Sequence, residues 1–320
     1  MATPSLLQLK AIRGFHVGGH AVEVTGKPIA TLNAVPGLAA RASDPNGQVM
    51  LGQMYVQHFQ QAVPTTPWPI YFWHGGGMTG STWEDTPDGR AGWHDYFMRR
   101  GFDTLLCDAV ERGRAGWPVP GTFTAGTPEA RTLEQAWDLF RLGSRDEHGQ
   151  WRPHESQLFP TENMEQFGRQ FVPRWTAHRQ LAVQAYSELL RRIGPGVVIA
   201  HSEGGRLAQE VAQATPGLIK ALVLIEPAGG ADPQDLHALQ DMPVCAVWGD
   251  FFSHSALWQE YRKSFDTWAQ AMQGAGGRLD TLDLPRLSMR GNSHFPMMDR
   301  NNLQVADVVL AWLRRAVPHV

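Results

Sequence analysis

The sequence predicts an α/β fold with a doubly wound, mostly parallel sheet and an inserted helical cap. Short apolar runs recur along the chain, and segments with helical periodicity separate them. Most of these runs contain almost no polar residue, as expected for strands that helices cover on both faces. The 320 residues can therefore form a single domain spanning residues 1–320.

The strand and helix assignments follow from these runs. Strands are predicted at residues 48–59, 69–73, 103–107, 196–200, 221–225, 243–248 and 279–288. Helices are predicted at residues 92–100, 175–193, 204–214, 256–273 and 303–317. In a sheet of this kind, ligands bind outside the carboxyl ends of the strands.

Residues 115–175 interrupt the alternation of strands and helices. They are rich in Gly, Pro, Trp and charged residues, with helical patterns at 128–143 and 162–172. This segment is too long for a simple connection, so we interpret it as a cap over the strand ends. Its aromatic side chains could line a pocket or pack the cap together: Trp117, Phe123, Trp137, Trp151 and Trp175.

The amino-acid composition argues against some classes of binding partner. A net charge of -3 without a basic run argues against nucleic acid or an anionic membrane. No stretch of about 18 apolar residues is present, so the chain as given is predicted to be cytoplasmic unless an export signal preceded it. Cys107 and Cys245 lie in apolar runs without metal-ligand spacing and are predicted to be buried free thiols. We expect no metal or cofactor, a small-molecule substrate, and a chain compatible with a homodimer.

The stretch Ala200-His201-Ser202-Glu203-Gly204 follows a predicted buried strand and begins a predicted helix. A serine at such a turn is held at the end of its strand, and small neighbours leave room for the tight backbone. The pentapeptide alone occurs by chance in many proteins, and Ala200 stands where the first glycine of the motif is usual. Its context makes Ser202 the candidate nucleophile.

A serine hydroxyl needs a general base and an acid that orients the base. His294 lies in the loop between the last predicted strand and the terminal helix, at the same sheet edge as Ser202; His254 is the alternative base. Glu226 and Asp250 each follow a predicted strand on that side. The residue pattern leaves both acids open.

The run His74-Gly75-Gly76-Gly77 follows the strand at 69–73 and can turn backbone N–H groups towards a developing oxyanion. The N–H of Glu203, at the predicted helix start, is a second donor. No Gly-Lys-Ser/Thr follows the glycines, so this is not a phosphate loop. Residues flanking the motifs could contact substrate, although core packing explains the aromatic ones equally well: Gly77, Trp83, Phe251, Phe252 and Phe295.

Taken in order, the motifs are HGGGMTGSTWEDTPDGRAGW, DAVERGRAG, AHSEGG, VLIEP, WGD and GNSHFPMMDRNNLQVAD. This series resembles the α/β-hydrolase superfamily, and more narrowly a bacterial esterase subgroup. The resemblance implies Glu226, rather than Asp250, as the acid. It also implies the N–H groups of Gly76 and Glu203 as the oxyanion donors. Glycine at 76 and 77 predicts a flexible oxyanion loop.

The predicted function is a serine carboxylic-ester hydrolase. It would act through an acyl-enzyme, without a cofactor, on small to medium esters that are apolar or aromatic. An acyltransferase or lactonase with the same triad, and a non-catalytic ligand-binding protein of this fold, are the alternatives.

Overall fold

The computed structural model describes residues 6–118 and 127–320. Its main sheet has the strand order β1-β4-β6-β5-β9-β10-β11-β12. Strand β4 is antiparallel to both of its neighbours, and from β6 to β12 each neighbouring pair is parallel. The strands are β1 (Leu9–Val24), β4 (Gly47–Gln61), β5 (Ile70–Trp73), β6 (Thr104–Asp108), β9 (Gly196–His201), β10 (Ile219–Ile225), β11 (Pro243–Trp248) and β12 (Arg278–Asp283). The predicted α/β fold is confirmed.

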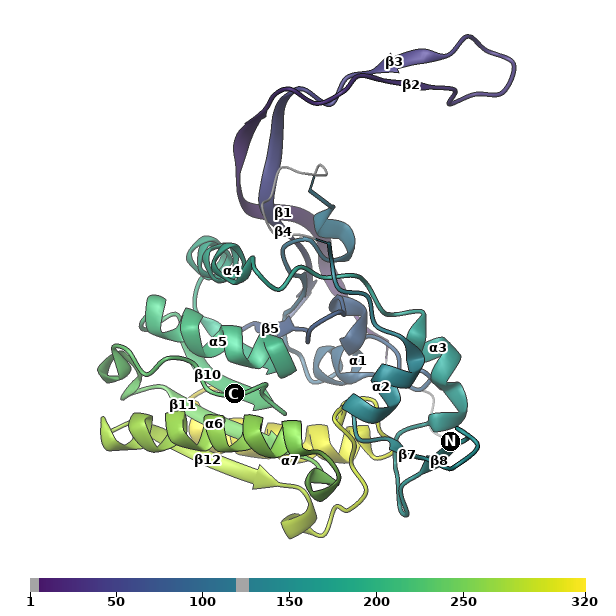
Figure 1. Ribbon diagram of the computed structural model, residues 1–320. Coiled ribbons are helices and arrows are strands. Elements are labelled where there is room, and N and C mark those ends of the chain that lie inside the picture. The colour runs from purple at the N-terminus through teal and green to yellow at the C-terminus, as the bar shows by residue number, and fades with distance from the viewer. Residues whose placement is uncertain (1–5, 119–126) are drawn as a thin grey trace.

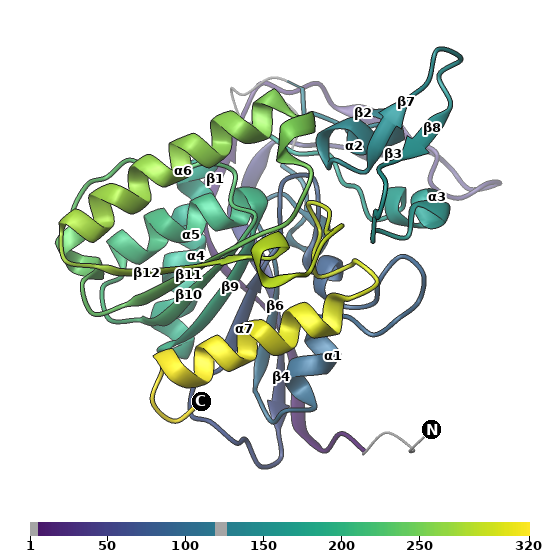
Figure 2. The same cartoon turned by 90° about the horizontal axis from the view of Figure 1, so that it is seen from below.

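Helices cover both faces of this sheet (Figure 2). One face carries α4 (Arg179–Ile193), α5 (Ser202–Ala214) and α6 (Ala256–Gly274), and the other carries α1 (Trp93–Met98) and α7 (Asn302–Ala316). Each face buries its own hydrophobic cluster, which explains why the central strands are apolar throughout. Cys107 and Cys245 are buried free thiols, as predicted.

Strand β4 was predicted at residues 48–59, whereas β1, β2 (Ala30–Leu32) and β3 (Arg41–Ser43) were not predicted. Strand β1 alternates half-exposed and exposed positions and contains several Gly and His residues, so it lacks the apolar run of a central strand. Together β1 and β4 form a twisted ribbon that leaves the body of the molecule (Figure 1). At its far end the short strands β2 and β3 pair with each other.

The predicted strand at 279–288 is too long. Strand β12 ends at Asp283, and Pro285 begins a 3-10 turn over Pro285–Leu287. Proline has no N–H to donate to a neighbouring strand and fixes its own φ, so the ladder stops before it.

Among the described residues of the cap, two short α-helices and one hairpin are present. These are α2 (Leu133–Leu139), α3 (Met164–Gly168), β7 (Gly143–Arg145) and β8 (Trp151–Pro153). Trp137 is buried and stacks on Trp151, with ring centroids 5.1 Å apart, while Trp117 is 57% exposed. Phe123 lies outside the described residues. Cap residues such as Trp137 and Phe167 join the same cluster as helix α7, so the cap packs onto the body.

Candidate active site

Ser202 is the first residue of α5, directly after β9 ends at His201. Its φ is +52°, a left-handed value that costs a non-glycine residue energy and is typical of functional turns. The glycines that follow are required by space. A Cβ on Gly204 would lie 2.4 Å from the backbone oxygen of His74. Ala200 is fully buried within β9, so the turn accepts its methyl group where glycine is usual.

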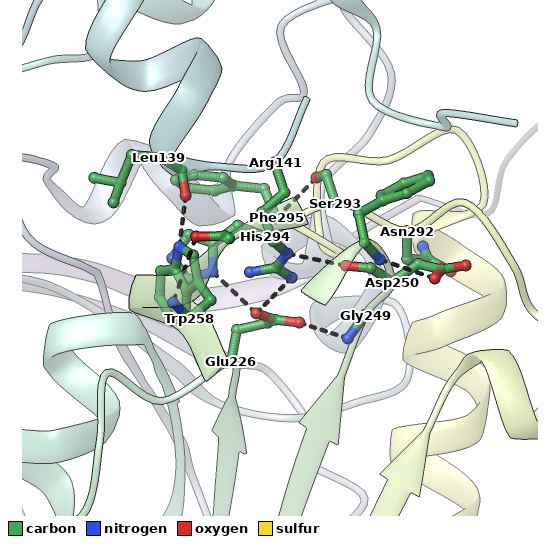
Figure 3. Close-up of polar contacts among 12 residues, drawn as sticks. Leu139, Arg141, Glu226, Gly249, Asp250, Trp258, Asn292, Ser293, His294 and Phe295 are labelled. Atoms are coloured by element: carbon green, nitrogen blue, oxygen red, sulfur yellow. Dashed lines mark hydrogen bonds and ion pairs between the residues drawn. The ribbon is translucent and has the colours of Figure 1, made fainter. Parts of the chain in front are cut away.

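Glu226 occupies the equivalent position on the next strand, directly after β10, and also has a positive φ of +48°. Its Oε2 lies 3.2 Å from Nδ1 of His294, and its Oε1 accepts a hydrogen bond of 2.5 Å from the N–H of Gly249. The side chains of Glu226 and His294 have no exposed surface. Figure 3 shows the carboxylate at the strand end, facing both the imidazole and the side chain of Arg141.

Arg141 was not predicted as a site residue. Its Nη2 donates to Oε2 of Glu226 at 2.8 Å, and its Nε donates to the backbone oxygen of Asp250 at 2.9 Å (Figure 3). Both side chains of the ion pair are fully buried. The residue lies in the cap, between α2 and β7, and no local pattern in that irregular segment marks it.

Asp250, the alternative acid, is not brought to His294. Its carboxylate accepts hydrogen bonds from the N–H groups of Phe251, at 2.8 Å, and Gly291, at 3.2 Å. Both bonds organise the loops after β11 and before α7. His254, the alternative base, is exposed and lies against His154 with ring centroids 4.4 Å apart.

The loop that carries His294 is held on several sides. The backbone N–H of His294 donates to the oxygen of Phe140 at 3.2 Å, and its backbone oxygen accepts from Nε2 of His201 at 2.9 Å. Its ring stacks on Phe140, with centroids 5.4 Å apart, and contacts Trp258, with centroids 4.0 Å apart. Together these contacts hold the position of the imidazole.

Electrostatics keep that imidazole neutral. Burial lowers the pKa of His294 well below its usual value, and the positive charges of Arg141 and Arg131 lower it further. With Nδ1 facing the carboxylate of Glu226, the lone pair of the other ring nitrogen, Nε2, is free to accept a proton. Nε2 is buried and makes no hydrogen bond within the described residues.

The glycine run after β5 lies against the nucleophile. A Cβ on Gly75 would lie 3.0 Å from Cβ of Ser202 and 2.8 Å from Nδ1 of His201. His74 fixes the loop: its Nδ1 donates to the Gly75 oxygen at 2.8 Å, and its Nε2 accepts from the N–H of Ala109 at 3.0 Å. In a trans peptide the next N–H points opposite to this oxygen, so the bond also sets the direction of the Gly76 N–H.

Further contacts brace the same loop. The oxygen of Gly77 accepts from the N–H of Val172 in the cap at 2.9 Å. The glycines predicted to be flexible are therefore anchored at Gly75 and Gly77. The N–H of Glu203 lies in the first turn of α5, where backbone donors have no helical acceptor.

Charged side chains surround this loop, and the sequence patterns did not predict their contacts. Nη1 of Arg174 donates to Oε1 of Glu203 at 2.9 Å, and its Nε donates to Oε2 of Glu129 at 2.9 Å. A Cβ on Gly76 would lie 2.1 Å from Nη1 of Arg174. Arg112 is buried, with Nη2 3.9 Å from Oε2 of Glu203.

Of the four aromatic residues predicted to contact substrate, two are buried in the core and two line a separate groove. Trp83 is fully buried, 5.0 Å from Phe72 between ring centroids, and Phe295 is 1% exposed against Phe167 and His201. Both belong to the core, and we do not retain them as substrate contacts. Phe251 and Phe252 line an open groove beside α6 whose lining residues do not include Ser202.

No cluster of three or more His, Cys, Asp or Glu side chains among the described residues could hold a metal ion. No helix in residues 6–118 and 127–320 is long and apolar enough to cross a membrane.

Comparison with known proteins gives the family. No family model matches the chain. The structure of a bacterial esterase superposes with a TM-score of 0.85 and is 32% identical, covering 99% of each chain. A probable secreted lipase, phiG, from a fungal species (strain ATCC 74256) is 28% identical over 82% of this chain and 86% of its own length. The chain belongs to the α/β-hydrolase superfamily, in the esterase group to which the bacterial enzyme belongs. It is a carboxylesterase-type hydrolase.

Proposed function

We propose that the protein hydrolyses carboxylic esters through an acyl-enzyme on Ser202, with His294 as the base and Glu226 as the orienting acid. One observation supports this most: a buried imidazole, kept neutral, is bonded to a carboxylate at the end of β10, and Ser202 begins the helix after the adjacent strand β9. These are the parts of a nucleophile–base–acid system.

In the first half-reaction, Oγ of Ser202 attacks the ester carbonyl while Nε2 of His294 takes its proton. The carboxylate of Glu226 then stabilises the imidazolium, since its Oε2 faces Nδ1. The tetrahedral oxyanion accepts hydrogen bonds from the N–H groups of Gly76 and Glu203. His294 passes its proton to the leaving alcohol, and an acyl ester on Ser202 remains.

In the second half-reaction, His294 removes a proton from water, which attacks the acyl ester. Collapse of the second tetrahedral intermediate releases the carboxylic acid and returns the proton to Ser202. The ring of Trp258 lies against His294, and Tyr261 follows it on α6, 5.3 Å away between ring centroids. Trp258 is buried and supports the base, whereas Tyr261 is half-buried and offers an aromatic surface beside it, which favours a small to medium ester with an apolar or aromatic part.

The test is labelling with a fluorophosphonate probe, followed by peptide mass spectrometry, alongside hydrolysis of 4-nitrophenyl acetate. We expect the adduct on the peptide that contains Ser202, and we expect Ser202→Ala to lose both label and turnover. Ser253→Ala, at an exposed serine, is the matched control and keeps both. Labelling that persists in Ser202→Ala would show that another residue is the nucleophile.

A further inference from the structure

Charges around the oxyanion loop are unequally paired. Arg174 bonds two carboxylates, Glu129 and Glu203, and Arg112 approaches Glu203. Arg131 lies in the same cluster, yet no carboxylate of the described residues lies within ion-pair distance of it. Arg174 and Arg112 therefore each have a carboxylate beside them, whereas Arg131 has no ion-pair partner among the described residues.

Arg131 is placed close to the reacting groups. Its guanidinium carbon lies 5.1 Å from the ring centroid of Phe140, and that ring stacks on His294. On the other side, a Cβ on Gly77 would lie 3.8 Å from Nε of Arg131. The guanidinium thus lies between the oxyanion loop and the aromatic stack that supports the base.

An unpaired guanidinium at this place carries an energetic cost. Arg131 is half-buried, and burial together with the charge of Arg174 lowers its pKa. The positive charge of Arg131 also disfavours the imidazolium form that His294 would take up during catalysis, because like charges repel. A neutral side chain could cover Phe140 without this cost, so the charge itself needs a role.

We propose that Arg131 binds a carboxylate on the substrate, so that the enzyme prefers esters of dicarboxylic acids in which one acid group is free. This rests on the function proposed above and names its substrate class. The planar fork of an arginine matches a carboxylate with two parallel hydrogen bonds. The half-buried ring of Tyr261 would contact the hydrocarbon between the two acid groups. A bound carboxylate would also offset the charge that opposes the imidazolium.

The experiment compares two aryl esters that differ only in charge: 4-nitrophenyl hydrogen glutarate and its neutral methyl ester. We expect kcat/KM of the wild type to favour the charged ester at least tenfold, mainly through KM. Arg131→Gln should abolish this preference, so that kcat/KM of the charged ester falls at least tenfold more than that of the neutral ester. Arg131→Lys should keep part of it, since a lysine retains the charge but not the fork.

Arg169→Gln is the matched control, because it removes one positive charge from an exposed position of the cap. It should keep the wild-type preference, which separates a local contact from long-range attraction. As a second readout, free glutarate should slow fluorophosphonate labelling of the wild type and not of Arg131→Gln. A label on Ser202 without charge preference and without protection by glutarate would overturn the role of Arg131 alone. Absence of any label would instead overturn the proposed catalytic serine.

Discussion

Glu226 and His294, on one side of Ser202, have no exposed surface, whereas Gly76 and Glu203, on the other side, are partly exposed among charged side chains. The acid–base half is fixed by buried hydrogen bonds and packed aromatic rings. The oxyanion half is fixed by backbone contacts of glycines and surrounded by arginine–carboxylate pairs. Under the functions proposed above, proton transfer would take place in the fully buried half, and the free acid group of the substrate would be bound in the partly exposed half.

The largest effect should come from the acid. Glu226→Gln removes the carboxylate that orients His294 and leaves Arg141 buried without its counter-ion. We expect kcat/KM for 4-nitrophenyl acetate to fall by about ten-thousand-fold.

Asp250→Asn is the matched control for that variant. The amide can keep one of the two loop hydrogen bonds of Asp250, so activity should fall less than tenfold. Equal losses in the two variants would contradict the assignment of Glu226 as the acid.

The oxyanion half is tested by Gly75→Ala. The new Cβ would lie within 3.0 Å of Ser202 and His201, so the loop has to move away and its N–H groups with it. We expect kcat to fall about a hundredfold, the usual cost of a lost oxyanion donor, with KM little changed. Gly274→Ala, at a site with no atoms within 4 Å, should have wild-type kinetics.

Arg141 links the cap to the acid–base half and should affect pH dependence. Its charge lowers the pKa of His294, and the base works only when neutral. In Arg141→Gln this pKa rises, so the acid limb of the kcat/KM profile should move to higher pH. The variant should also lose about 3 kcal/mol of stability, because the carboxylate of Glu226 stays buried without its partner. Arg141→Lys, which keeps the charge, should retain most of the wild-type profile.

The smallest effect is expected at Ala200. Ala200→Gly restores the usual glycine of the turn but removes a buried methyl group. We expect turnover within about twofold of wild type and about 1 kcal/mol less stability by chemical denaturation. A gain in turnover above tenfold would mean that the methyl group restrains the nucleophile.

The sequence patterns predicted where the strands end, but they did not predict which side chains contact each other at those ends. Ser202, Glu226 and His294 each follow or adjoin a predicted strand, and the parallel sheet brings these positions to one edge. Arg141 contacts Glu226 across 85 residues from the irregular cap, so no periodicity could reveal it. Strand β1 was missed because a half-exposed ribbon lacks a continuous apolar run.

Side-chain direction was equally invisible in the sequence. Trp83 and Phe295 neighbour the motifs along the chain, yet both rings turn into the core. Adjacency to a motif residue fixes the backbone position, while packing decides which way a large ring points. Arg131 shows the converse: it neighbours no motif, and the fold brings it to the oxyanion loop.

The bond between Arg141 and Glu226 restricts how such an enzyme can diversify. A cap transplanted from a relative without an equivalent arginine would leave a buried carboxylate unpaired, and the recipient would lose stability before its new specificity could be tested. The cap residue Arg141 and the acid Glu226 therefore have to be exchanged together when the cap is replaced.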